Sequence, residues 1–87
     1  DRMSFTGELA NELLYKNPDK IIIIARIKNH EAKCSIRSGK GIILPPIIEN
    51  ALVGLKGFGG GHEHACGCVV AEDQLNILIE NIREQIK

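Results

Sequence analysis

Four consecutive isoleucines, at positions 21–24, constrain the fold of this 87-residue chain more than any other feature. Isoleucine branches at Cβ and favours extended backbone, and a run of it puts apolar side chains on both faces of a strand. Such a strand must be covered on both faces, so residues 21–25 predict a central buried strand. The strand continues as Arg26, Ile27 and Lys28, where polar and apolar residues alternate.

Two further strands are expected. Residues 32–38 follow a short polar turn, which predicts a strand antiparallel to the first. Its side chains alternate, so Lys33, Ser35 and Arg37 share one face and the opposite face is apolar. Residues 66–71 are short and mostly apolar, and they predict a third strand.

Two helices are expected before the third strand. Residues 6–14 predict a helix with Thr6 as its N-cap and with Leu9 and Leu13 on one face. Residues 47–55 predict a second helix, because the two prolines just before it are tolerated in a first turn.

A closing helix begins at Glu72 or Asp73. Its apolar residues recur at helical spacing and form one stripe: Leu75, Leu78, Ile79, Ile82 and Ile86. Together the elements predict an α/β fold, a small mixed β-sheet of three to five strands packed by about three helices. Aromatic residues are 3% of the chain, so we expect an aliphatic core.

The length predicts one domain over residues 1–87. Because the chain opens at Asp1 rather than with methionine, we expect a fragment of a longer protein. No apolar run reaches the length of a membrane span, and no signal-peptide pattern is visible. Three cysteines, an odd number without a secretion signal, favour a reducing cytoplasm over a disulfide framework.

The formal net charge is zero, but residues 20–57 carry seven basic side chains against two acidic ones. Such a chain is no general polyanion binder, although its basic middle can meet an anion at one place. A solvated mixture of charges explains the same pattern equally well.

Four glycines crowd into residues 57–61, in a stretch that reads GFGGGHEHACG to position 67. The stretch is not a dinucleotide fingerprint, since the last required glycine falls on His62, and it lacks the terminal Gly-Lys of a Walker A loop. We expect a loop between a helix and a strand, with Phe58 anchoring it to the core. Its backbone N–H groups are either a nest for an anion, with His62 at the edge, or part of a flexible turn.

A metal site is the other interpretation of this stretch, because His62, His64, Cys66 and Cys68 are all zinc-type ligands. Alternate residues of a strand lie about 6.5–7 Å apart, so four of them span about 20 Å, too far for one ion. The spacing also lacks a C-x2-C pair. The sequence therefore predicts no metal site here, and it predicts that the two cysteines fill the sheet as small apolar residues.

The segment 59-GGGHEHACG-67 resembles the glycine-rich signature of the DHHA1 domain, the C-terminal half of DHH-family phosphoesterases. The family pattern is GGGH-x-x-A-small-G, and Cys66 occupies the small position. Upstream, 35-SIRS-38 resembles the S-x-R-S strand of the family, and the order of elements agrees over nearly the whole chain. Glu63, where proline is frequent, and the unusual His64 depart from the pattern. Alanyl-tRNA synthetases carry a related C-terminal domain, but its glycine run usually lacks the histidine.

The resemblance implies that hydrolysis and substrate binding belong to two different domains. In this family the N-terminal DHH domain holds manganese or a similar divalent metal such as magnesium, and it hydrolyses a phosphodiester with metal-activated water. The DHHA1 domain binds the substrate. The chain then is the substrate-binding part of a phosphoesterase or a RecJ-like exonuclease, of archaeal type by composition. It is expected to contain no catalytic residue and no cofactor of its own.

The resemblance also implies the residues that bind phosphate: Ser35, Arg37, Gly59, Gly60, Gly61 and His62. Arg37 makes a fork-like contact that lysine cannot reproduce, the glycines bring backbone N–H groups close, and His62 donates a hydrogen bond. Ser35 has a competing role as a hydroxyl satisfied inside the sheet.

The implied partners are single-stranded nucleic acid or a short oligonucleotide or nucleotide, together with the N-terminal DHH domain. Two other functions stay open. One is a protein-interaction module of a degenerate DHH relative in a replication complex. The other is an RNA-binding domain of the alanyl-tRNA synthetase type.

Overall fold

The computed structural model describes residues 2–86, with side chains described from Phe5 to Ile86. In chain order the elements are α1 (Arg2–Lys16), β1 (Ile21–Lys28), β2 (Glu31–Ser38), α2 (Leu44–Ala51), β3 (Gly57–His62), β4 (Ala65–Ala71), the 3₁₀ turn η1 (Glu72–Gln74) and α3 (Leu75–Gln85). The predicted α/β fold is confirmed, with four strands in the order β1-β2-β4-β3. Every pairing is antiparallel, so the sheet is not mixed. The reason is that β1–β2 and β3–β4 are hairpins joined by tight turns, which only antiparallel strands allow.

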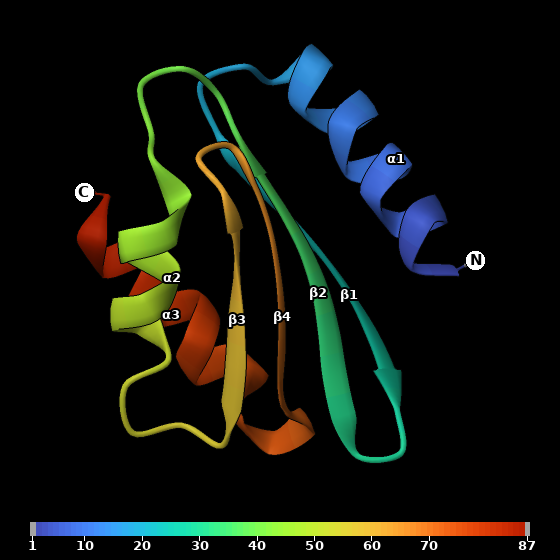
Figure 1. Cartoon of the computed structure of the whole chain (residues 1–87), viewed down its shortest axis with the longest axis vertical. Helices are drawn as coiled ribbons and strands as arrows, with labels where there is room; N and C mark the ends of the chain where they lie inside the picture. The colour runs from blue at the N-terminus through green and yellow to red at the C-terminus, as the bar shows by residue number, and fades with distance from the viewer. Residues whose placement is uncertain (1, 87) are drawn as a thin grey trace.

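The helices divide between the two faces of the sheet (Figure 1). Helix α1 lies on one face, over β1 and β2. Helices α2 and α3 pack against each other on the opposite face, where they contact β3 and β4. The sheet therefore separates a larger core under α2 and α3 from a smaller contact under α1.

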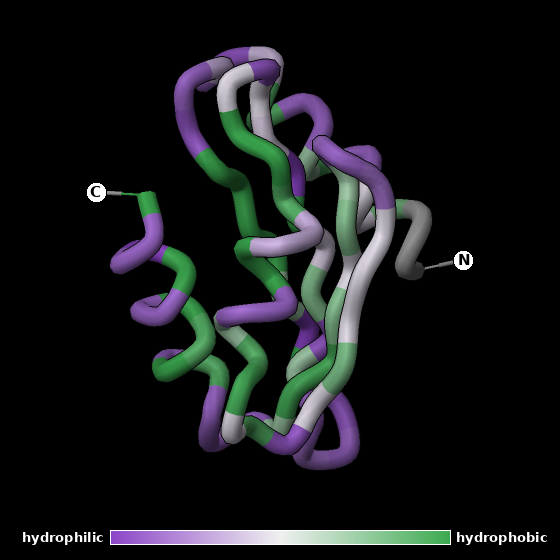
Figure 2. The backbone as a smooth tube through the Cα atoms, turned by 60° about the vertical axis from the view of Figure 1, so that its left-hand side comes forward, coloured by the Kyte–Doolittle hydropathy of each residue, from purple (hydrophilic) through white to green (hydrophobic). Residues whose placement is uncertain are grey.

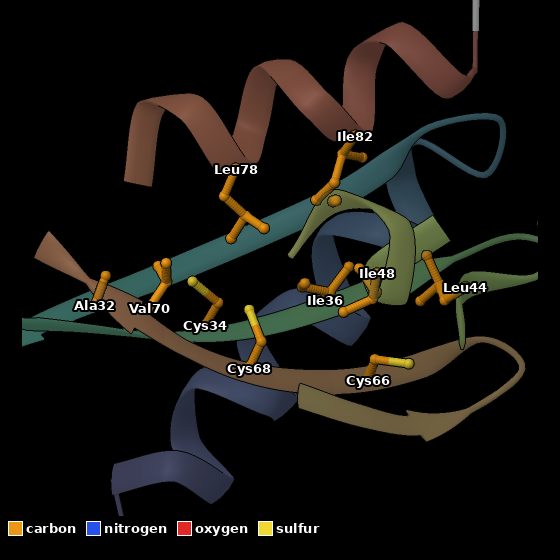
Figure 3. Close-up of a cluster of buried hydrophobic side chains, with 11 residues drawn as sticks. Ala32, Cys34, Ile36, Leu44, Ile48, Cys66, Cys68, Val70, Leu78 and Ile82 are labelled. Carbon is orange, nitrogen blue, oxygen red and sulfur yellow. The ribbon is translucent and has the colours of Figure 1, made fainter. Parts of the chain in front are cut away.

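The larger core is aliphatic, as the composition predicts. Cys34 and Cys68 of the sheet point toward α3 in Figure 3, and Cys66 lies in the same core below Leu44. Cys66 and Cys68 act as small apolar core residues, as predicted, and Cys34 is buried with them.

Leu78 and Ile82 reach down from α3. Figure 2 shows apolar and polar residues alternating along α3. Of the predicted stripe, Leu78 and Ile82 are buried and Leu75 packs against the core, whereas Ile86 is exposed.

Strand β1 is an edge strand, so the prediction of a central strand was wrong. Its isoleucines are half-buried. Ile21 and Ile23 pack against the core under α3, whereas Ile22 and Ile24 pair with β2 residues that face α1. The isoleucines of β1 must be packed on both faces of the strand, and α1 and α3 pack against these faces. A second flanking strand is not required.

Helix α1 begins earlier than predicted and turns a different face to the sheet. Thr6 lies inside the helix rather than at its cap. Thr6 and Ala10 are buried, whereas Leu9 and Leu13 are more than a third exposed. Small residues on this face of α1 let the helix lie close to the sheet, directly on the polar side chains of β2.

Helix α2 starts at Leu44 with both prolines in its first turn, and it ends at Ala51, earlier than predicted. The chain then turns through Gly54, whose φ of 81° suits glycine. Among residues 2–86, no helix is long and apolar enough to cross a membrane.

Candidate functional site

The glycine run is a strand, not the predicted loop. Residues 57–62 form β3, which pairs with β4 from Gly57↔Val70 to His62↔Ala65 and closes through a two-residue turn. In an extended strand successive N–H groups point to alternate sides, so they do not converge on one anion. The predicted nest is therefore absent from the described structure. The strand lies at the edge of the sheet, and all six of its residues are exposed.

The glycines of β3 face two different sides. Gly57, Gly59 and Gly61 pair with Val70, Cys68 and Cys66 and so lie on the side of α2 and α3. At each of them a Cβ atom would overlap atoms of β4. Gly61 also has a φ of 151°, which side-chain-bearing residues rarely adopt. These three glycines are required for the hairpin to form.

Gly60 points the other way and is not required for folding. A Cβ atom there would meet nothing within 4 Å, so no helix covers it. Directly opposite lies Gly67 of β4, where a Cβ would make only an ordinary contact, 3.5 Å from the Cys34 carbonyl oxygen. The side of the sheet that carries α1 over β1 and β2 thus has a bare surface over β3 and β4. We call this surface the platform, and it consists of Phe58, Gly60, His62, Ala65, Gly67 and Val69.

Arg37 and His62 lie at the same end of the platform. Arg37 of β2 pairs with Ala65 of β4, and Ala65 pairs with His62 of β3. Since neighbouring strands are about 4.8 Å apart, the Cα atoms of Arg37 and His62 are about 10 Å apart. Both side chains leave the sheet on the platform side, because directly paired residues share a face.

The guanidinium of Arg37 is held in place before any ligand arrives. Its Nε donates to Asn11 Oδ1 of α1 at 2.8 Å. Its Nη1 donates to the Ile36 carbonyl at 2.9 Å and to the Cys66 carbonyl at 3.4 Å. None of the hydrogen bonds among the side chains described from Phe5 to Ile86 involves Nη2. Gly7 of α1 gives the guanidinium its room, because a Cβ there would lie 2.7 Å from Nη2.

Ser35 does not join the other predicted site residues at the surface. It is 4% exposed, beneath α1, and its hydroxyl lies 2.9 Å from Thr6 Oγ1. We assign Ser35 to the packing of α1 on the sheet, the competing role that the sequence allowed.

His64 lies in the turn after β3 and fastens a neighbouring loop. Its Nδ1 is 3.0 Å from the Ile42 carbonyl and 3.3 Å from the Ser38 hydroxyl. A carbonyl only accepts, so Nδ1 carries the proton. The His64 carbonyl also accepts from the Ser38 N–H at 3.1 Å. His64 is therefore a structural residue of the turn between β3 and β4.

The four zinc-type residues are separated by the sheet itself. Cys66 and Cys68 are buried in the core, whereas His62 lies on the platform. Burial raises the pKa of the Cys66 thiol, so at neutral pH it is uncharged. Across residues 2–86 no three His, Cys, Asp or Glu side chains gather around a place for a metal ion.

Phe58 is the residue that the sequence interpretation misplaced. Expected in the core, it is 71% exposed and lies on the platform, four residues from His62 along β3. The spacing in the sequence is enough to locate it. Alternate residues of a strand lie on the same face, so Phe58, Gly60 and His62 share one face if the segment is a strand. Only the assumption of a loop concealed this pattern.

Comparison with known proteins gives a family and a fold. The sequence pattern of the DHHA1 domain matches residues 3–87, nearly the whole chain. Among solved structures, the C-Ala domain from Aquifex aeolicus alanyl-tRNA synthetase is similar, with a TM-score of 0.78 and 21% sequence identity. The match covers 91% of this chain and 76% of that one. Among curated proteins, no sequence matches.

Proposed function

The chain belongs to the DHHA1 domain family, and from this premise we propose that it binds the phosphate backbone of a nucleic-acid substrate for a metal-dependent phosphodiesterase. The parent protein is then a DHH-family phosphoesterase or a RecJ-like exonuclease. This chain supplies substrate binding, and the N-terminal DHH domain supplies the chemistry.

One observation carries the proposal: the opposed pair Gly60 and Gly67 leaves bare backbone beside a positioned arginine and a histidine. A ligand can approach the strand backbone closely from the platform side only where no Cβ intervenes. Packing does not explain the missing side chain at Gly60, since a Cβ there has open space. Ligand approach explains it.

The charge on the platform suits an anion. Arg37 carries a positive charge, and its Nη2, which the hydrogen bonds among the described residues leave unused, can donate to a phosphate oxygen. Hydrogen bonds from an ionised donor are about twice as strong as neutral ones. Because Asn11 and two carbonyls already hold the guanidinium, binding costs little further side-chain entropy. His62 can donate from the opposite side of the phosphate.

Hydrolysis is assigned to the parent protein, not to this chain. The manganese or magnesium ion of the DHH domain would generate the attacking hydroxide when bound there. The described residues bind and orient the substrate and gather no ligand set for that ion. The three buried free cysteines agree with a reducing compartment, so we propose a cytoplasmic parent.

The experiment that tests the proposal is a titration with single-stranded hexathymidylate, followed by amide chemical shifts. We expect the largest shifts at Gly60, His62 and Gly67, and we expect His62→Ala to weaken binding about fivefold. The control is His30→Ala, in the β1–β2 turn, which should bind as the wild type does. If saturating ligand moves none of these amides, or if the His62 variant binds equally well, the proposal fails.

A protein-interaction role is the second candidate, and α1 favours it. Phe5, Leu9 and Leu13 recur at i, i+4 and i+8 and are 65%, 37% and 38% exposed. An exposed apolar stripe on a helix is typical of a contact surface. The occupant that the family suggests is the DHH domain of the same parent chain. Leu9→Glu should abolish binding of the separately produced DHH domain, and undiminished binding would exclude this surface.

A further inference from the structure

Phe58 occupies the end of the platform opposite His62. It shares the face of Gly60 and His62 and is 71% exposed. An aromatic ring left in water contributes little of the burial energy that rings supply in a core. Packing within the described chain thus does not explain its position. Its location beside bare backbone offers the face of the ring to a planar ligand group.

The sheet places a second cation in the same row as Phe58. Phe58 pairs with Val69 of β4, and Val69 pairs with the half-buried Lys33 of β2. This row repeats the arrangement of the Arg37 row, with a cation on β2, a small or branched residue on β4, and a ring on β3. The platform therefore has two ends of similar chemistry with two glycines between them.

The distance between the two rows sets the size of the ligand. Four residues separate Lys33 from Arg37 and Phe58 from His62, which at about 3.3 Å per residue makes about 13 Å. Phosphates of a stacked strand advance about 3.4 Å per nucleotide, so this distance corresponds to about four nucleotides, or fewer if the strand is stretched. One nucleotide, whose base and phosphate are joined through a single sugar, does not span both rows.

We propose that Phe58 and Lys33 form a second subsite, in which a base stacks on the Phe58 ring and Lys33 contacts a neighbouring phosphate. The inference rests on the proposed function, which places another phosphate of the same strand at Arg37 and His62. The ligand is a single-stranded oligonucleotide of about four nucleotides. A mononucleotide is too short to reach both rows, and a duplex keeps its bases paired inside the helix, so none is free to lie on the Phe58 ring.

The test compares thymidine monophosphate, hexathymidylate and hexauridylate by calorimetry on the chain and its variants. We expect both hexanucleotides to bind at least tenfold more tightly than the mononucleotide. Phe58→Ala should weaken hexanucleotide binding about 5- to 150-fold, the range for loss of one base–aromatic stack. Mononucleotide binding should not change, and Phe58→Trp should restore the hexanucleotide affinity. Tyr15→Ala, which removes an 87% exposed ring on α1, is the control.

Salt dependence tests the cation separately. Lys33→Gln should reduce the salt slope of hexanucleotide binding by about one and leave the mononucleotide slope unchanged. Thermal unfolding of each variant confirms that it folds.

The outcomes separate this inference from the proposed function. If Phe58→Ala binds the hexanucleotides as the wild type does, or if a hairpin duplex binds more tightly than they do, the second subsite is overturned. In that case continued loss of binding in His62→Ala would uphold the proposed function. If neither the Phe58 nor the His62 variant loses affinity, both proposals fall.

Discussion

The two faces of the β3–β4 hairpin differ in what they demand of the same residue type. On the face toward α2 and α3, glycine is required, because a Cβ at Gly59 would overlap Cys68. On the opposite face the backbone leaves room for a side chain at Gly60, yet none is present. The packed face explains how the hairpin folds, and the bare face is the surface that we propose binds nucleic acid. Alternate glycines of one run therefore lie on faces with different requirements.

The largest expected effect comes from adding a methyl group to the packed face. Gly59→Ala should lower the free energy of unfolding by about 3 kcal/mol, as overpacking against a neighbouring strand does. The matched variant Gly60→Ala, one residue along, should change it by less than about 1 kcal/mol. Urea denaturation measures both. Equal effects of the two variants would contradict the division between the faces.

The next effect concerns binding on the bare face. Arg37→Lys keeps the charge but loses the bonds that hold Nη2 in position, so it should weaken hexathymidylate binding by about 2 kcal/mol, roughly thirtyfold. Lys40→Arg, in the loop after β2, is the control and should bind normally. Calorimetry gives both constants. Unchanged affinity in the Arg37 variant would remove this residue from the site.

A smaller effect is expected from the residue that positions Arg37. Asn11→Ala removes the 2.8 Å bond to Nε and should weaken binding by about 1 kcal/mol. The Nε–H of Arg37 should also exchange faster with solvent, which nitrogen-detected NMR records. Asn11→Asp should restore the slow exchange but not the affinity, because a carboxylate competes with the phosphate for the guanidinium. Slow exchange in Asn11→Ala would show that Arg37 is held by other contacts.

The smallest expected effect is a pH dependence of the packed face. Burial raises the pKa of the Cys66 thiol above its usual 9.0. The folded state then holds this proton more tightly than the unfolded state, so the stability it adds is present below pH 9 and is lost as pH rises through the raised pKa. The stability advantage of the wild type over Cys66→Ala should shrink by up to about 0.8 kcal/mol at pH 9.5. A constant difference from pH 7 to 9.5 would contradict the burial.

The sequence predicts the individual helices and strands of this fold better than it predicts which of them lie side by side. The alternation of β2 correctly places Arg37 on one face, and the stripe of α3 correctly identifies Leu78 and Ile82 as core residues. The isoleucines of β1 indicate cover on both faces but not its source. In this chain helices supply the cover, and the strand lies at the edge. Pairing between two strands that are far apart in the sequence produces no periodic residue pattern in either strand.

For the candidate site, the sequence proposes residues, and the structure gives their arrangement. The resemblance identifies Arg37 and His62, and the register places them at one end of the same bare surface. The local pattern of β3 favours a loop, because glycine is depleted in strands and lacks a side chain to pack. Pairing with β4 overrides that preference. Once the loop becomes a strand, Phe58 moves from the expected core to the exposed platform.

The most direct test of the central claim replaces Gly60 with leucine and measures both unfolding and hexathymidylate binding. We expect the free energy of unfolding to stay within about 1 kcal/mol of the wild type, because the side chain has open space. We expect binding at least tenfold weaker, because the leucine occupies the place of the phosphate backbone. A Gly60→Leu variant that folds and binds with wild-type affinity would show that the bare face is not the binding surface.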